Sequence, residues 1–271
     1  MSESERNEIP VRKLSLPFDG SIPRHWFGGN AMQTHVFNGL NLVFPEGERF
    51  FVRSVMDHVS QIEDRGLLAQ VKGFAGQEGH HAHEHERYFS TLREQGYQID
   101  GFLGRFTKFN RFCSRYLPVV FRLAVTAGAE HYTATLGAFT LRNSRLGEAH
   151  PVMRRLITWH AVEEIEHKSV AFDVLHEVND SYLLRTAGFV FATAVLLGWA
   201  AVGTRMLLRQ DGIGRAEARA MLRDLDRRDN GAMRRAIRAG VMAYFRRDFH
   251  PSENDDLELA HSYLGEIGIA A

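Results

Sequence analysis

Apolar residues return every three or four positions along most of this chain of 271 residues. That spacing is typical of amphipathic helices, whereas a half-buried strand alternates at every second position. No stretch keeps up the alternation and the turn residues of a strand. The pattern therefore predicts a protein built almost entirely of helices.

Proline, acidic residues and glycine mark where these helices begin and end, because they suit the first position, the first turn and the residue after the end. By these signals we expect helices over residues 27–43, 45–62, 65–95, 102–116, 118–143 and 151–179, then an apolar helix and shorter arginine-rich helices to about residue 263. Residues 1–25 contain three prolines and are expected to form a loose arm. We divide the rest into a helical bundle (26–180) and a C-terminal extension packed on or beside it (181–271).

Charge and cysteine content narrow the class of protein. There are 33 basic and 33 acidic residues, so the chain lacks the basic excess typical of nucleic-acid binding. The single cysteine, Cys113, forms no thiolate metal cluster and fits a reducing compartment. The polar N-terminus does not resemble a secretory signal. We expect a cytoplasmic protein, with membrane association as the alternative.

One apolar segment is the reason why membrane association remains an alternative. Nineteen uncharged residues, 186–204, lie between Arg185 and Arg205, which is the threshold length for crossing a bilayer. The next stretch, 205–247, holds twelve arginines against five acids and would suit anionic headgroups. More than half of the segment is Ala, Gly or Thr, so we favour a helix packed closely on the bundle over membrane contact. A homodimer through the arginine-rich helices also stays open.

Two polar clusters fall on predicted helices. In QEGHHAHEHE, Glu78 and His81 are three positions apart, and Glu164 and His167 repeat this spacing in WHAVEEIEHKSVAFDV. Residues three apart on a helix lie about 60° apart and share a face. Glu166 points elsewhere and is expected to be solvated. A charged helix surface is the ordinary explanation for either cluster alone.

Two further acids make that explanation insufficient. Glu48 lies on the helix before the first pair, and Glu130 lies on the small, apolar helix before the second. A lone buried carboxylate is costly unless it is paired or bound to metal. Two Glu-x-x-His pairs plus one Glu from each of two other helices is the ligand set of a dimetal site in a four-helix bundle. Glu46 remains an alternative to Glu48, and Glu163 remains an alternative to Glu164.

This order resembles the ferritin-like di-iron superfamily, which includes ribonucleotide reductase small subunits and bacterial multicomponent monooxygenases. The phrases FPEGERFF, GQEGHHAHEH, AGAEHYTA and WHAVEEIEHKSVAFDV more closely resemble a bacterial family of predicted metal-dependent hydrolases, over roughly residues 25–265. The resemblance implies an all-α, ferritin-like four-helix bundle with additional C-terminal helices.

His160 adds a second resemblance, because His160, Glu164 and His167 share one helix face. This arrangement is similar to the 4-aminobenzoate N-oxygenase family, whose di-iron site carries an additional histidine there. The implied metal ligands are Glu48, Glu78, His81, Glu130, His160, Glu164 and His167. A supporting or core histidine is the alternative for His160.

Carboxylates and imidazoles in these numbers suit two iron ions, with manganese as the alternative, better than zinc. We therefore expect a di-iron oxygenase that uses dioxygen to oxidise a small apolar or aromatic substrate. Phe50, Phe51, Phe74, Phe139 and Phe172 would shield such a pocket, and for any one of them ordinary core packing is the favoured alternative. The electron donor is unidentified, since no flavin or nucleotide motif is present. The alternative is a metal-dependent hydrolase with a metal-bridging hydroxide.

Overall fold

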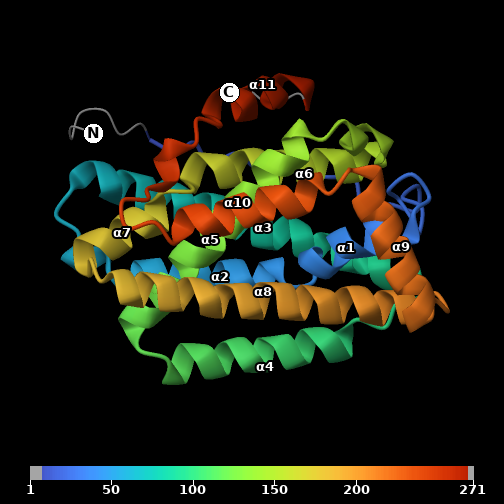
Figure 1. Ribbon diagram of the computed structural model, residues 1–271, viewed down its shortest axis with the longest axis horizontal. Helices are drawn as coiled ribbons and strands as arrows, with labels where there is room; N and C mark the ends of the chain where they lie inside the picture. Colours follow the sequence, from blue (N-terminus) through green and yellow to red (C-terminus); the bar gives the residue numbers. More distant parts are fainter. Residues whose placement is uncertain (1–7, 268–271) are drawn as a thin grey trace.

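The computed structural model describes residues 8–267, which are almost entirely helical (Figure 1). The α-helices are α1 (Ala31–Asn41), α2 (Phe44–Met56), α3 (Arg65–Glu94), α4 (Asp100–Tyr116), α5 (Val119–Arg142), α6 (Pro151–His167), α7 (Val170–Val178), α8 (Tyr182–Gln210), α9 (Arg215–Arg228), α10 (Ala232–Tyr244) and α11 (Leu257–Glu266). Within the described residues there is no strand, only an isolated bridge between Phe27 and Ala149. The all-α prediction is confirmed.

Local sequence signals account for several helix boundaries. The Asp64 carboxylate accepts hydrogen bonds from the N–H groups of Gly66 and Leu67 at 2.7 and 3.1 Å and so caps α3. Gly96, with a φ of +90°, ends the same helix. The helix expected over 151–179 is instead broken at Lys168 and Ser169, and α7 then packs against α3 and α5.

The centre of the fold is formed by α2, α3, α5 and α6. Four pairs of these helices are in contact: α2 with α3, α5 with α6, α2 with α5, and α3 with α6. Helix α5 lies innermost, and its middle residues, from Leu123 to Ala134, are all buried. Figure 1 shows α8 running along this bundle, with α4 beneath it and α11 on the opposite side.

Helix α8 is long and apolar enough to cross a membrane by length and composition, with a mean hydropathy of 1.7 over its most apolar window. One side of it packs against α5 and α1. The approach is close because glycines face the neighbouring helices. A Cβ on Gly39 would lie 2.6 Å from the Ala200 carbonyl oxygen, and one on Gly188 would overlap the backbone of Ala124.

The N-terminal arm differs from expectation in its described part. Leu16 and Ile22 are 1% and 3% exposed, so the segment packs on the bundle instead of lying loose. The Arg12 guanidinium donates to both oxygens of Glu166 at 2.7 and 2.8 Å. This pairing also corrects the expectation that Glu166 is solvated. Residues 1–7 lie outside the described range.

The glycine contacts generate the first prediction. We expect Gly188→Ala to destabilise the protein by about 1–3 kcal/mol, because the new methyl group forces α8 away from α5. Gly198 lies on the same helix with open space around its Cβ position. Gly198→Ala should stabilise by up to about 1 kcal/mol through helix propensity alone. Urea unfolding of both variants measures the difference, and equal stabilities would contradict the close packing.

Candidate metal centre

All seven residues predicted as ligands point into the interior of the bundle, where an eighth, His85, joins them. We call the set the glutamate–histidine cluster: Glu48 from α2; Glu78, His81 and His85 from α3; Glu130 from α5; and His160, Glu164 and His167 from α6. None of the eight residues is more than 7% exposed. Four helices thus bring together residues that are far apart in sequence.

The cluster contains two groups that could each hold a cation. In the first, one ligand atom from each of Glu78, His81, Glu164 and His167 lies within 4.8 Å of the others. In the second, the same holds for Glu48, His85 and His160. Glu164 connects the groups, because its Oε1 lies 2.9 Å from His160 Nε2 and 3.8 Å from His167 Nε2.

Glu130 approaches the first group from α5. Its Oε2 lies 3.1 Å from His167 Nδ1, and its side chain is fully buried. Further along α5, a Cβ on Gly137 would lie 3.0 Å from the Ala161 carbonyl oxygen of α6, so the two helices approach each other closely. The burial of Glu130 matches the expectation from its apolar surroundings.

Many polar atoms of the cluster lack any hydrogen bond. Both carboxylate oxygens of Glu48, Glu78 and Glu130 are buried without a hydrogen bond, as is Nδ1 of His81, although imidazoles or carboxylates lie within 4 Å of each of these residues. More than nine-tenths of buried polar groups in folded proteins are hydrogen-bonded. Buried oxygens and imidazole nitrogens that converge without partners are the donor set that divalent cations need. The residues present therefore fit two metal ions.

The pKa values of the cluster residues also indicate that the protein without metal lacks balancing charge. Burial, together with the neighbouring carboxylates, raises the pKa of Glu48 and Glu78 well above the usual range. Burial also raises the pKa of Glu130 to about 7. Although burial alone would lower the pKa of His167, Glu130 and Glu164 raise it to about 9. Without metal, protons must offset the carboxylate charges that cations would otherwise balance.

Glu163, the alternative to Glu164, has a different position. Its Oε2 accepts a hydrogen bond from His81 Nε2 at 2.9 Å, and its Oε1 lies 3.4 Å from Arg12. When Glu163 is ionised, this bond places the proton of His81 on Nε2 and leaves Nδ1 free to face the cluster. A carboxylate that orients a ligating imidazole in this way is the usual support of a metal site. Arg12, far away in sequence, carries no local signal that could have revealed this role.

Glu46, the alternative to Glu48, forms an ion pair with Arg49 on the same helix at 3.5 Å and is partly exposed. Among the predicted shielding residues, Phe74 packs against His167 with ring centroids 5.1 Å apart. Phe44, which was not predicted, packs against His85 and His160 at 5.0 and 4.7 Å.

His85 was not among the predicted ligands. It lies one turn beyond His81 on α3, on the face that Glu78 and His81 share, and this helical spacing is a signal that could have included it. Its Nε2 lies 2.6 Å from Nδ1 of His160, and its own Nδ1 has no partner. Burial and the adjacent His160 lower the pKa of His85 well below its usual value, so its imidazole is neutral.

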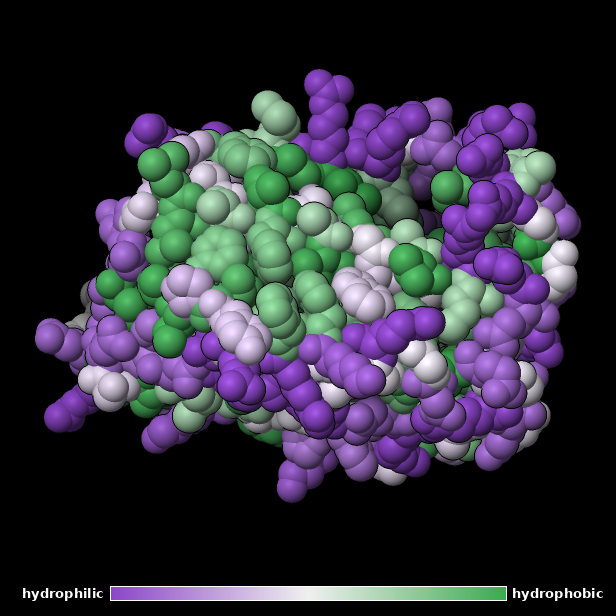
Figure 2. Space-filling model, turned by 90° about the horizontal axis from the view of Figure 1, so that it is seen from below, coloured by the Kyte–Doolittle hydropathy of each residue, from purple (hydrophilic) through white to green (hydrophobic). Residues whose placement is uncertain are grey.

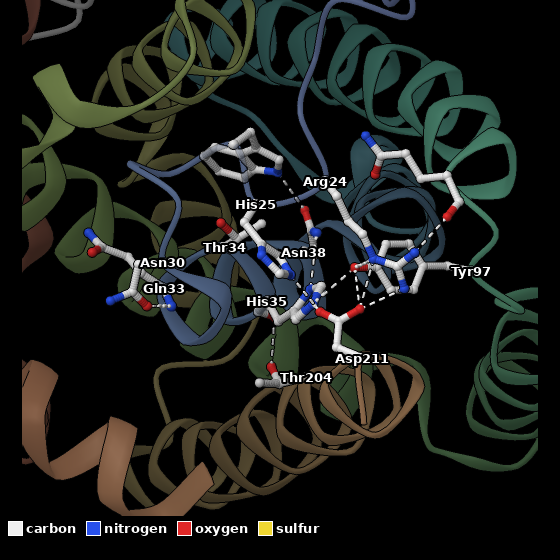
Figure 3. A network of polar contacts seen from close by, with 12 residues as sticks. Arg24, His25, Asn30, Gln33, Thr34, His35, Asn38, Tyr97, Thr204 and Asp211 are labelled. Atoms are coloured by element: carbon white, nitrogen blue, oxygen red, sulfur yellow. Dashed lines mark hydrogen bonds and ion pairs between the residues drawn. The ribbon is translucent and has the colours of Figure 1, made fainter. Parts of the chain in front are cut away.

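A second group of histidines and a carboxylate lies elsewhere, around Asp211 (Figure 3). His25 and His35 both donate from Nε2 to Asp211 Oδ2 at 2.6 Å, while Arg24 and Tyr97 donate to Oδ1. Although burial alone would raise it, these hydrogen bonds lower the pKa of the Asp211 carboxyl group. Every donor has its acceptor here, so we interpret this group as a structural anchor between the arm and the end of α8.

A cavity of about 470 Å³ leads away from the glutamate–histidine cluster. His85, His160 and Glu164 line its inner end, and most of its wall is apolar side chains of α1, α5 and α8. Arg205, Arg209, Arg215 and Arg219 line its outer part. This volume is in the range of small-molecule binding sites.

Fold and site together define an all-helical protein with a buried glutamate–histidine centre able to bind two metal ions. The chain belongs to the family described as predicted metal-dependent hydrolases, whose sequence profile matches residues 10–255. This confirms the resemblance to that family. No curated protein and no solved structure matches the chain. The likenesses to ferritin-like proteins and to the N-oxygenase family stay predictions.

The unpartnered oxygens of Glu78 generate the second prediction. We expect Glu78→Gln to reduce bound manganese from two ions per chain to one or fewer, because the substitution removes a charged ligand at constant shape. Glu86→Gln is the matched control, since Glu86 is an exposed residue of the same helix paired with Arg49. Elemental analysis after dialysis measures the ratio. Two tightly bound ions in Glu78→Gln would contradict the assignment.

The third prediction concerns the pH dependence of stability without metal. Burial raises the pKa of Glu163 from 4.5 to about 8, so between these values the folded protein holds a proton that the unfolded chain has released. Glu130 acts in the same direction between pH 4.5 and about 7, and His167 between pH 6.5 and about 9, whereas His81 and His85 add stability with rising pH only below pH 6.5.

The chelated protein should therefore lose stability from pH 6.5 to 8, with an unfolding midpoint lowered by at least about 2 °C. Metal competes with protons for the same atoms, so the stabilisation by added manganese should grow over this range. Differential scanning calorimetry with and without chelator measures both trends. A midpoint of the chelated protein that rises from pH 6.5 to 8 would refute this electrostatic account.

Proposed function

We propose that the protein is a metal-dependent hydrolase whose glutamate–histidine cluster holds two divalent cations next to a cavity for an apolar substrate. The observation that carries the proposal is the convergence of buried, unpartnered carboxylate and imidazole atoms at the inner end of that cavity. The family description supports hydrolysis as the reaction. Two bound cations would supply Lewis-acid polarisation of a carbonyl or phosphoryl oxygen and a water made acidic at neutral pH.

The chain's own residues contribute substrate binding and exclusion of water. Apolar side chains from α1, α5 and α8 would hold the apolar part of the substrate, while Phe44 covers His85 and His160. In the protein without metal, the tautomers that satisfy both contacts have His85 donating from Nε2 to His160, and His160 donating from Nε2 to Glu164. A cation held by Glu48, His85 and His160 would replace these protons, and Nδ1 of His85, which has no hydrogen bond, is the atom that could bind it.

Oxidation of an apolar or aromatic substrate with dioxygen is the second candidate. It is favoured by the donor set, since four glutamates and several histidines from four helices is the arrangement of di-iron carboxylate proteins. Hard oxygen ligands of this kind suit iron or manganese. This reaction would need an electron donor as a partner, and the hydrolytic reaction would not.

The fourth prediction separates the two reactions. Protein loaded with manganese or zinc under nitrogen should hydrolyse chromogenic nitrophenyl esters, and kcat/KM should rise about fourfold for each methylene that the cavity buries, until the cavity is filled. Chelation and Glu78→Gln should abolish turnover, whereas Glu86→Gln should leave it unchanged.

Dioxygen should make no difference to these rates. If the anaerobic protein cleaves none of the esters, while the reduced, iron-loaded protein consumes dioxygen in proportion to an added aromatic substrate, hydrolysis is wrong and the oxidative candidate replaces it. Rates measured with a closed oxygen electrode and by absorbance of nitrophenolate give both results on one preparation.

A further inference from the structure

Helix α8 has an apolar outer face. Its exposed positions recur at helical spacing from Leu183 to Ala201, and over this distance of about 27 Å they carry no polar side chain. The stripe consists of Leu183, Ala187, Val190, Ala194, Leu197 and Ala201. A surface helix ordinarily presents polar residues on its outer side. Here Leu183, Val190 and Leu197 are 75%, 56% and 40% exposed.

Helix α4 lies beside this stripe and extends it. Rings of α4 pack against Trp199 of α8, with Phe106 and Trp199 centroids 5.1 Å apart. Further along α4, Phe112 and Tyr116 are 58% and 62% exposed. Figure 2 shows the resulting face, on which hydrophobic side chains gather over one half and hydrophilic side chains surround them. Contiguous exposed apolar surface of this kind marks an interaction site.

The charges that α4 and α8 carry along this face are of one sign. Helix α4 exposes Arg105, Lys108, Arg111 and Arg115, and none of them forms an ion pair with a described residue. Beyond the stripe, Arg205 and Arg209 end α8 without such pairs. No acid occurs from residue 101 to 116 or from 182 to 210. The face is therefore an apolar surface with a cationic fringe.

We propose that this face docks on the surface of a bilayer containing anionic phospholipids, with α8 and α4 lying in the interfacial plane. Apolar side chains would enter the boundary between headgroups and acyl chains, and the cationic fringe would meet the phosphates. Helix α8 lies on the membrane instead of crossing it, because its other side is packed against α5 and α1.

Charge complementarity favours a membrane over a second copy of this chain. A twofold contact through the same patch would bring the two fringes of arginine and lysine together. The stripe also borders the cavity, since Leu197 and Ala201 line it, as does Arg205 just beyond the stripe. An apolar molecule dissolved in the bilayer could therefore reach the cavity without passing through water. This docking does not depend on which reaction the metal centre performs.

The experiment is co-sedimentation of the metal-loaded, full-length protein with vesicles. Binding is expected to vesicles of equal parts phosphatidylcholine and phosphatidylglycerol, to weaken with salt, and to be much weaker for phosphatidylcholine alone. The double variant Val190→Asp/Leu197→Asp should lose binding. Leu257→Asp is the control, because Leu257 is similarly exposed at 44% but lies on α11, on the opposite side of the molecule.

A second pair of variants tests the fringe. Arg111→Gln and Arg115→Gln should each weaken binding to the anionic vesicles about fivefold, whereas Arg154→Gln on α6 should not. Thermal unfolding checks that each variant is folded, and Val190→Ser/Leu197→Ser replaces the aspartate pair if that pair does not fold.

Three results would overturn the proposal. The first is wild-type protein that does not bind the anionic vesicles. The second is a folded Val190 and Leu197 double variant that binds them as tightly as wild type. The third is a dimer, seen by sedimentation velocity, that this double variant dissociates while vesicles remain unbound, which would assign the face to a second copy of the chain.

Discussion

Four buried glutamates set the main electrostatic constraint on this fold. Glu48, Glu78, Glu130 and Glu164 are each at most 2% exposed. Charges of one sign so close together and so far from water are tolerated only with compensating cations or protons. The bundle supplies four imidazoles around them, and the centre is stable at neutral pH only insofar as protons or metal complete the balance. Small residues along α5, which let the helices approach, serve this arrangement directly.

Helical periodicity made most of the centre predictable from sequence. Glu78 and His81, like Glu164 and His167, are three residues apart, and residues at this spacing share one face of any straight helix. What could not be predicted depends on long-range contacts. Arg12 reaches Glu163 across 151 positions, and Asp211 gathers donors from three separate segments. The break after His167 was also missed, because nothing in the local sequence marks it as a helix end.

The two expectations for residues 186–204 need not exclude each other. Composition alone gave small and apolar residues, which fit either a packed helix or membrane contact. In the structure these residues lie on different sides of α8: Gly188 faces α5, whereas Val190 and Leu197 face outward. One side of a helix can thus pack in a bundle while its other side exposes apolar residues. Mean hydropathy, which averages over both sides, does not distinguish these two roles.

The position of Arg12 has a consequence for the order of folding. Its partners Glu163 and Glu166 are synthesised some 150 residues later, so the segment around Arg12 leaves the ribosome long before α6 exists. Contacts of such high sequence separation carry a large loop-closure cost and form late. The cation that faces Glu163, the partner of His81, therefore comes from a segment made early, and its contact with Glu163 is among the last to form. Until then, Glu163 holds His81 without the neighbouring charge of Arg12.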